Sequence, residues 1–103
     1  MNVTLKTSLI VDAKLRLRLH TDAFNAEIGD LIEAAANDQL RRNAVQQAQL
    51  DADSADPLIK RAILTYVRAF FGDPENAERY KADYDEQKAT LMMTSGYTVW
   101  EES

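Results

Sequence analysis

The sequence lacks cysteine altogether, which excludes disulfides, thiolate metal sites and cysteine nucleophiles. Glycine is scarce, and the three glycines at positions 29, 72 and 96 are too isolated to form a phosphate-binding loop. The single histidine, His20, has no serine, cysteine or metal-ligand partner near it in the sequence, so we interpret it as an exposed turn residue. These absences predict a protein that is not an enzyme and holds neither a metal nor a cofactor.

Long hydrophobic runs are absent as well. Asp12, Lys14 and Arg16 interrupt the apolar residues near the N-terminus before a signal peptide or a membrane span can form. We therefore expect a soluble protein that is not exported and has no membrane partner. Its formal net charge of -5 repels phosphate and anionic lipid, which disfavours a general affinity for nucleic acid.

The residues that are present have an ordinary globular composition. Hydrophobic residues make up 46% and charged residues 28% of a 103-residue chain, which is long enough for one domain. The two prolines mark helix starts, because Asp56-Pro57 and Asp73-Pro74 each combine a side-chain acceptor at the N-cap with a proline at the first helical position.

Gly72 suits the left-handed residue that ends a helix, so the sequence predicts one helix over 57–71 and another over about 74–94. The first has an apolar stripe at steps of three and four, typical of a central core helix. The second has a narrow, half-aromatic stripe bordered by acids, and we expect it to pack outside the first. The two stripes are Ile59, Ala62, Ile63, Tyr66, Val67 and Phe70, and then Ala77, Tyr80, Tyr84, Lys88 and Leu91.

The first half of the chain predicts two more helices. One covers about 23–42, with Asp22 or Asn25 as its N-cap. The other covers 7–18, where the segment LRLRL alternates like a strand but the apolar residues keep a helical step. That step is carried by Val11, Leu15 and Leu19.

The expected fold is all-α, a small bundle of about four helices over residues 1–95 followed by a short extended C-terminal tail over 96–103. The polar stretch at about 45–55 loses its periodicity and is predicted to be a flexible linker within the bundle. Tyr97 and Trp100 lie in the tail, where each either folds back onto its own domain or fills a pocket of a partner.

Charged and aromatic residues have structural interpretations. Acids on the last predicted helix, without a histidine or a calcium-type loop, indicate a solvated face. Basic residues lie among acids on helix surfaces, which favours ion pairs within or between subunits over phosphate binding. Aromatic residues near Gly72 are expected to form the hydrophobic seam of a helical hairpin. The intersubunit ion-pair candidates are Arg41, Arg42, Lys60, Arg61 and Arg68, and the seam residues are Tyr66, Phe70, Phe71, Tyr80 and Tyr84.

Three features in this order carry a resemblance to a known family. An acid-rich helix ends in Leu-Ile-Glu-Ala-Ala within TDAFNAEIGDLIEAA, residues 21–35. A helix of the form Ile-Lys-x-Ala-Ile-x-x-Tyr-Val then ends in an aromatic residue and glycine, and a last helix carries spaced tyrosines. Both lie within DPLIKRAILTYVRAFFGDPENAERYKADYDEQKATL, residues 56–91. Over roughly residues 8–97 the chain resembles the head-tail connector, or adaptor, proteins of tailed bacteriophages and prophages.

The resemblance implies an all-helical structural subunit that assembles as a ring of about twelve copies beneath the portal protein. Such a ring extends the DNA channel of the capsid, lets double-stranded DNA pass without sequence-specific binding, and offers a docking site to the next stopper or tail-completion protein. It implies a place in the virion at the head-tail interface, after synthesis in the host cytoplasm. The C-terminal segment of the family contacts the portal, which makes Tyr97, Val99 and Trp100 the candidates for that contact.

The sequence also bears on two other classes of function. A small helical DNA-binding or regulatory protein is the alternative, although a recognition helix needs an exposed basic face and no predicted helix is dominated by lysine and arginine. An enzyme would need a nucleophile, a metal site or a tuned pair of acids, none of which the sequence offers.

Overall fold

The computed structural model of the protein describes residues 1–42, 44–53, 56–72 and 75–93. Within these ranges the chain forms helices and no strand, so the predicted all-α class is confirmed. There is one short helix more than the four expected. The predicted extended tail, residues 96–103, lies outside the described residues. The helices are α1 (Val3–Leu17), α2 (Asn25–Arg41), α3 (Gln47–Asp51), α4 (Pro57–Phe70) and α5 (Ala77–Met93).

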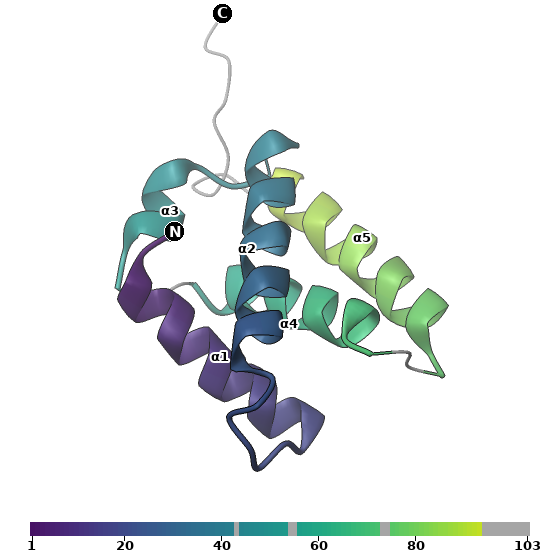
Figure 1. Cartoon of the computed structure of the whole chain (residues 1–103). Coiled ribbons are helices and arrows are strands. Elements are labelled where there is room, and N and C mark those ends of the chain that lie inside the picture. Colours follow the sequence, from purple (N-terminus) through teal and green to yellow (C-terminus); the bar gives the residue numbers. More distant parts are fainter. Residues whose placement is uncertain (43, 54–55, 73–74, 94–103) are drawn as a thin grey trace, which may run out of the picture.

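The helices α2 and α4 lie at the centre of the bundle, with α1 and α5 on opposite sides of them (Figure 1). Of these, α4 packs against all three other long helices, whereas α5 packs chiefly on α4. The core lies where α1, α2 and α4 meet and is closed at one end by α3. Its largest fully buried apolar side chains are Leu9, Ile28, Ile32, Val45, Leu50, Ile59, Ile63, Leu64, Val67 and Leu91.

The central helix α4 forms as the sequence predicts. The Asp56 side chain accepts a hydrogen bond from the backbone N–H of Leu58 at 2.9 Å, and the proline between them opens the first turn. At the other end Gly72 follows the helix with a φ of 65°, the left-handed conformation that was expected there. Both signals are local, which is why they could be recognised without tertiary contacts.

The helix α1 forms where the helical step predicted it, but it begins earlier. It begins at Val3 rather than at residue 7, because the Asn2 side chain accepts a hydrogen bond from the N–H of Leu5 at 3.0 Å and caps the first turn. Val11 and Leu15, two of the residues that carry the step, are 55% and 71% exposed and do not form the buried face. The face that packs on the core instead consists of Leu5, Leu9 and Ala13.

The predicted N-cap of α2 is also wrong. The helix begins after Phe24, and no side chain makes a capping hydrogen bond there. Asp22 instead forms an ion pair with Lys14 of α1, and this hydrogen bond and charge hold the pKa of the Asp22 carboxyl below its ordinary value. The carboxylate therefore connects the turn before α2 to α1 rather than capping α2.

The polar stretch predicted as a linker contains structure. Residues Gln47–Asp51 form the helix α3, and both Val45 and Leu50 are buried in the core. The backbone N–H of Asn2 donates to the carbonyl of Leu50 at 2.9 Å, which fixes α3 against the start of α1. Too few apolar residues occur here to give a sequence periodicity, although those few fill the end of the core.

The last helix, α5, keeps the predicted face but begins later. It starts at Ala77 rather than near residue 74, and the predicted cap at Asp73-Pro74 lies outside the described residues. Tyr84 and Leu91 are its buried residues, and the other members of the predicted stripe are half-buried. The expectation of an outer helix with a narrow apolar face is confirmed.

Replacing Gly72 should destabilise the protein through backbone strain. We expect Gly72→Ala to lower the free energy of unfolding by about 1 kcal/mol, because a residue with a Cβ is disfavoured at a φ of 65°. No atom lies within 4 Å of the added Cβ, so a steric clash does not contribute. Urea unfolding measures the difference, and Gly72→Asn is the control, since asparagine tolerates this conformation better. Equal stability of the alanine variant and the wild type would contradict the assignment.

Candidate functional site

A groove of about 500 Å³ lies between α2, α4 and α5. The rings of Tyr66, Phe70 and Tyr84 provide its apolar wall. Phe70 is 43% exposed, so part of this wall is open to solvent or to a partner. The polar lining residues are Asn37, Asp38, Arg41, Lys81, Asp85 and Lys88.

A polar network centred on Asp38 of α2 connects the groove walls. One carboxylate oxygen, Oδ2, accepts hydrogen bonds from the Tyr84 hydroxyl at 2.8 Å and from Lys88 Nζ at 2.7 Å. The other oxygen, Oδ1, faces Arg41 at 3.3 Å. Lys88 Nζ also lies 4.9 Å from the centre of the Tyr84 ring, within range of a cation–π contact. The network joins α2 to α5 across nearly fifty residues of sequence.

The network changes the acidity of its members. Burial alone would raise the pKa of the Asp38 carboxyl, but the hydrogen bonds from Lys88 and Tyr84 and the charge of Lys88 outweigh burial and lower that pKa. Burial raises the pKa of Tyr84 above its ordinary value of 10, and the Asp38 carboxylate raises it further. Around neutral pH the carboxyl is therefore ionised and the phenol neutral, which is the state that the hydrogen bonds require.

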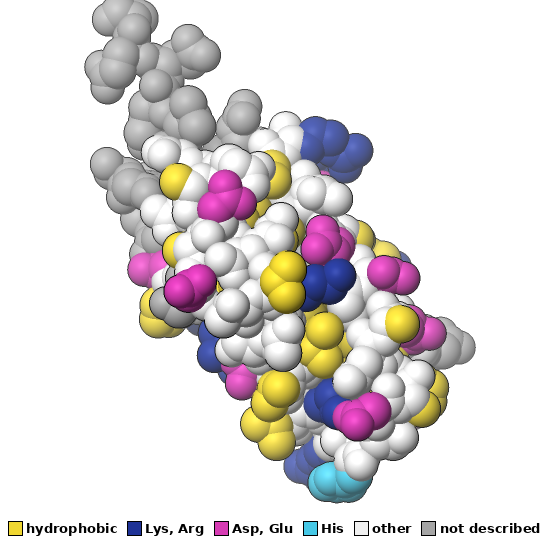
Figure 2. Space-filling model, turned by 60° about the vertical axis from the view of Figure 1, so that its left-hand side comes forward, with side chains coloured by type: hydrophobic (Ala, Val, Ile, Leu, Met, Phe, Trp, Pro, Cys, Tyr) yellow, Lys and Arg dark blue, Asp and Glu magenta, His cyan; other side chains and the backbone are white. Residues whose placement is uncertain are grey.

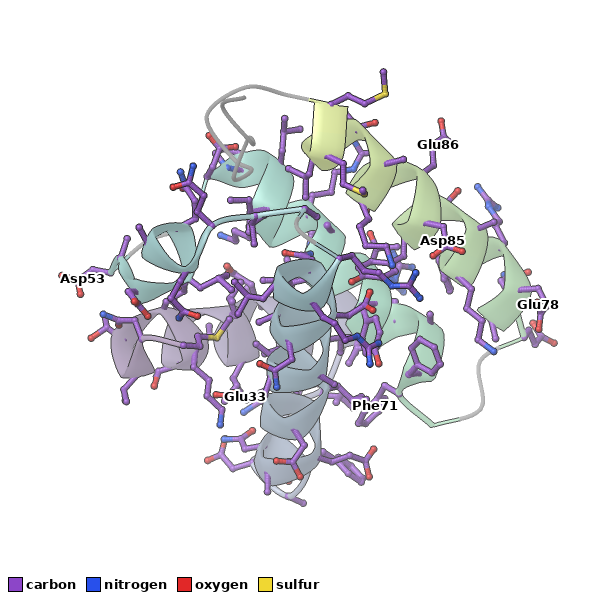
Figure 3. All side chains as sticks on the ribbon, turned by 90° about the horizontal axis from the view of Figure 1, so that it is seen from above. Glu33, Asp53, Phe71, Glu78, Asp85 and Glu86 are labelled. Atoms are coloured by element: carbon purple, nitrogen blue, oxygen red, sulfur yellow. The ribbon has the colours of Figure 1, made fainter. Side chains whose placement is uncertain are left out.

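The aromatic residues form the predicted seam between α4 and α5, with one exception. The Tyr66 ring lies 5.1 Å from that of Tyr84 in an edge-to-face arrangement and 4.5 Å from that of Phe70, centroid to centroid. Phe71 instead points from the end of α4 toward α2, as Figure 3 shows, and its ring meets that of Phe24 edge-on at 5.6 Å. Phe71 therefore joins α4 to the start of α2 rather than to α5.

Three of the predicted intersubunit cations pair with acids of their own subunit. Arg41 and Arg42 both lie near Asp38, at 3.3 and 3.8 Å, yet their side chains are 75% and 62% exposed. Lys60 of α4 forms an ion pair with Asp12 of α1. These contacts do not test pairing between subunits, because the exposed arginines keep donors that face outward.

The other two predicted cations differ from each other. Arg68 donates a hydrogen bond to the Tyr80 hydroxyl at 2.8 Å and stacks over the Tyr80 ring, with its guanidinium carbon 4.6 Å from the ring centre. It therefore belongs to the contact between α4 and α5. Arg61 is exposed and forms no ion pair with any described residue.

The remaining predicted residues form no cluster. His20 is exposed beyond the end of α1, and no group of three or more histidine, aspartate or glutamate side chains could hold a metal within the described ranges. Glu78 and Glu86 point away from the bundle on α5, as Figure 3 shows. The portal-contact candidates Tyr97, Val99 and Trp100 lie outside the described residues.

Asp38 is the residue of the groove that the sequence did not indicate. Its neighbours in the sequence are Arg41 and Arg42, which suggest only an exposed ion pair on one helix. The partners that give it importance, Tyr84 and Lys88, lie on another helix. Asp38 could have been identified only from the knowledge that residues 84 and 88 contact residue 38 in the folded chain.

A known protein family matches the chain. The model of a family described as phage connector protein matches residues 9–98, which is most of the chain. The chain belongs to this phage connector family. Comparisons with curated proteins and with solved structures gave no significant match.

Membership confirms the resemblance found in the sequence and gives the connector a structural role and a place in the virion. In the part of the connector that the structure describes, no helix is both long and apolar enough to cross a membrane. The groove and the network around Asp38 therefore belong to a structural protein, and they hold three helices of the connector at fixed distances from one another.

Removing the Tyr84 hydroxyl should weaken the connector. We expect Tyr84→Phe to lower the free energy of unfolding by about 1–2 kcal/mol, because the ring stays packed while the hydrogen bond to Asp38 is lost. Tyr66→Phe is the matched control: its hydroxyl makes no hydrogen bond with a described residue, so it should cost about 0.5 kcal/mol or less. Similar losses in both variants, measured by urea unfolding, would contradict the role of the network.

The network should also make stability depend on pH. The pKa of Asp38 is lower in the folded state than its ordinary value of 3.8, so its contribution is complete above that value and is lost as the pH falls through the folded pKa. We expect Asp38→Asn to cost about 2 kcal/mol at neutral pH and much less at about pH 3. Asp85→Asn is the control, since this carboxylate is 74% exposed and lies 3.8 Å from the same Lys88. A constant cost of Asp38→Asn across this pH range would contradict the prediction.

Proposed function

We propose that this connector assembles as a ring of about twelve copies under the phage portal protein, where it extends the DNA channel and offers a docking site to the next stopper or tail-completion protein. The observation that carries the proposal is membership in the phage connector family over residues 9–98. Before assembly the subunit resides in the host cytoplasm, and afterwards at the head-tail interface of the virion.

The distribution of charge supports a ring through which DNA passes without being bound. The net charge is -5, and Arg41, Arg42 and Lys60 already have acidic partners within the subunit. An acidic channel wall repels the DNA backbone, so the duplex slides without sticking to it. A ring whose channel was lined by these three cations would contradict this part of the proposal.

The same observations disfavour the DNA-binding or regulatory alternative. A recognition helix presents a row of free basic side chains to DNA. In α4, Lys60 forms an ion pair with Asp12, and Arg68 stacks on the Tyr80 ring. Arg61 alone remains unpaired on α4 among the described residues, which is too little for a groove-reading surface. In α1, Lys6 and Lys14 pair with Glu33 and Asp22, which leaves only Arg16 and the C-cap residue Arg18 unpaired.

We further propose that the C-terminal tail makes the contact with the portal, through Tyr97, Val99 and Trp100. The support is chemical: Tyr97 and Trp100 are three positions apart in the sequence, and tyrosine and tryptophan are enriched among the residues that contribute most to binding a partner. The exposed cations Arg41, Arg42 and Arg61 remain the candidates for ion pairs between neighbouring subunits, together with Lys60 and Arg68.

Co-sedimentation with a purified portal ring of the same phage tests both proposals. The wild-type connector should bind at about one copy per portal subunit. A chain ending at Ser95 should keep its helical circular dichroism spectrum and lose attachment, because the described helices end at Met93. Trp100→Ala is the milder variant and should weaken attachment about tenfold or more.

The outcomes separate the two proposals. No binding of the wild type at micromolar concentration would overturn the connector function itself. Binding of the truncated chain at wild-type strength would leave that function in place and overturn only the assignment of the tail.

A further inference from the structure

The helix α1 has a second apolar face that points away from the core. Leu5, Leu9 and Ala13 are buried, whereas Val11 and Leu15, on the opposite side of the helix, are 55% and 71% exposed. Figure 2, turned so that the side carrying α1 comes forward, shows hydrophobic side chains lying open between lysine and arginine side chains. The outward row of the helix follows steps of three and four and consists of Thr4, Ser8, Val11 and Leu15. The exposed Arg18 is the C-cap residue, with a left-handed φ of 58°, and follows the last residue of the helix.

A helix with two apolar faces is typical of a helix that packs against protein on both sides. Single exposed apolar residues are common on protein surfaces, but two of them one turn apart on the same helix form a continuous ridge. An apolar ridge bordered by polar residues is typical of a protein contact. Among the described residues, none covers this ridge, which leaves it open to another copy of the chain.

The helix α5 presents the complementary surface. The side opposite its buried Tyr84 and Leu91 carries the small exposed residues Ala82 and Ala89, followed by Met93, which is 82% exposed. Small side chains in a row let another helix approach closely and leave room for larger side chains. Three acids border this row, namely Glu78, Asp85 and Glu86.

The two faces also have opposite charge. Of the four cations over residues 3–18, Lys6 and Lys14 pair with Glu33 and Asp22 of the same subunit. Arg16 and Arg18 are exposed and form no ion pair with any described residue. On the outward side of α5, Glu78 and Asp85 each lie 3.8 Å from a lysine of the same helix, whereas Glu86 is exposed and forms no ion pair with any described residue. Opposite charges of this kind direct association and suppress wrong pairings.

The placement of the faces suits a closed ring. In Figure 1 α1 and α5 lie on opposite sides of the central pair α2 and α4. A ring built by rotation needs two different complementary faces on each subunit, on roughly opposite flanks, so that each copy contacts one neighbour on either side. Faces that lay on the same flank would instead give a closed dimer.

We propose that the outward face of α1 (Val11 and Leu15), together with its C-cap residue Arg18, packs against the outward face of α5 (Ala82, Glu86 and Ala89) of the next copy. This assignment rests on the proposed ring and specifies which surfaces form it. Leu15 and Val11 fill the row of small residues, and Arg18 meets the acids that border it. Repetition around the axis covers both faces of every copy.

Paired cysteines test the contact, because the wild-type chain has none. The variants combine Leu15→Cys with Ala82→Cys or with Ala89→Cys, so that a disulfide forms only where the two Cα atoms approach within about 7 Å. Both positions of a pair lie on opposite flanks of one subunit, so a bridge within the subunit is excluded. Oxidation of the full-length chain on the portal ring should therefore give a ladder of covalent multimers for at least one pair. Leu15→Cys with Ala48→Cys, an exposed alanine of α3, should give none.

Charge reversal gives a second, independent readout. Arg18→Glu and Glu86→Lys should each weaken ring assembly, whereas the double variant should regain it, because every interface then carries the exchanged pair. Leu15→Glu should weaken assembly about tenfold or more and leave the circular dichroism spectrum of the subunit unchanged, since the side chain lies outside the core.

The outcomes distinguish this inference from the connector function. A ladder with rescue by the double charge reversal supports the assigned faces. Wild-type binding to the portal ring without a ladder from either pair, and without rescue, overturns the faces and leaves the function standing. A wild-type chain that neither self-associates nor binds the portal ring overturns both.

Discussion

The burial of α4 is the interaction on which the rest of the structure depends. The chain has no cysteine and therefore no disulfide, so apolar packing is a main source of stability for a domain of this size. Ile59, Ile63 and Val67 are completely buried, and each fully buried side chain of this type contributes about 1.5–3 kcal/mol. Because α4 packs against α1, α2 and α5, it is the helix that the other three long helices share as a packing partner.

The helix α5 needs more than apolar packing. Only Tyr84 and Leu91 of its side chains are buried, which leaves the helix free to shift along α4 unless directional contacts hold it. The Asp38 network supplies such contacts, because hydrogen bonds of 2.7 and 2.8 Å from two residues of α5 converge on one carboxylate of α2. The stack of Arg68 on Tyr80 adds a contact nearer the start of the helix.

The charges of this connector divide into those used within the subunit and those left on its surface. Asp12 and Asp38 each join one helix to another through a lysine, and Asp22 joins the turn before α2 to α1 in the same way. Glu86 and Arg18 are exposed and form no ion pair with any described residue. The paired charges therefore connect parts of the subunit, whereas Glu86 and Arg18 lie on its surface.

The sequence by itself determined the all-helical class, the start, end and buried face of α4, and the family. These depend on local signals: the Asp56-Pro57 start, Gly72 at the end, and an apolar stripe wide enough to define the core side. The order and spacing of the helix motifs were enough for the connector resemblance, which the family match confirmed.

Only the tertiary structure decided what depends on a second helix. Val11 and Leu15 have the spacing of a core stripe, but Leu5 and Leu9 occupy the core, and a helix with two apolar faces does not reveal in its sequence which one packs inward. The stretch at 45–55 looked like a linker because burial of Val45 and Leu50 depends on the space left at the end of the core. Asp38 has no signal in the sequence, because Tyr84 and Lys88 come near it only after the chain has folded. Local sequence determines which helices form, whereas the faces they bury are set by the partners available when all of them pack together.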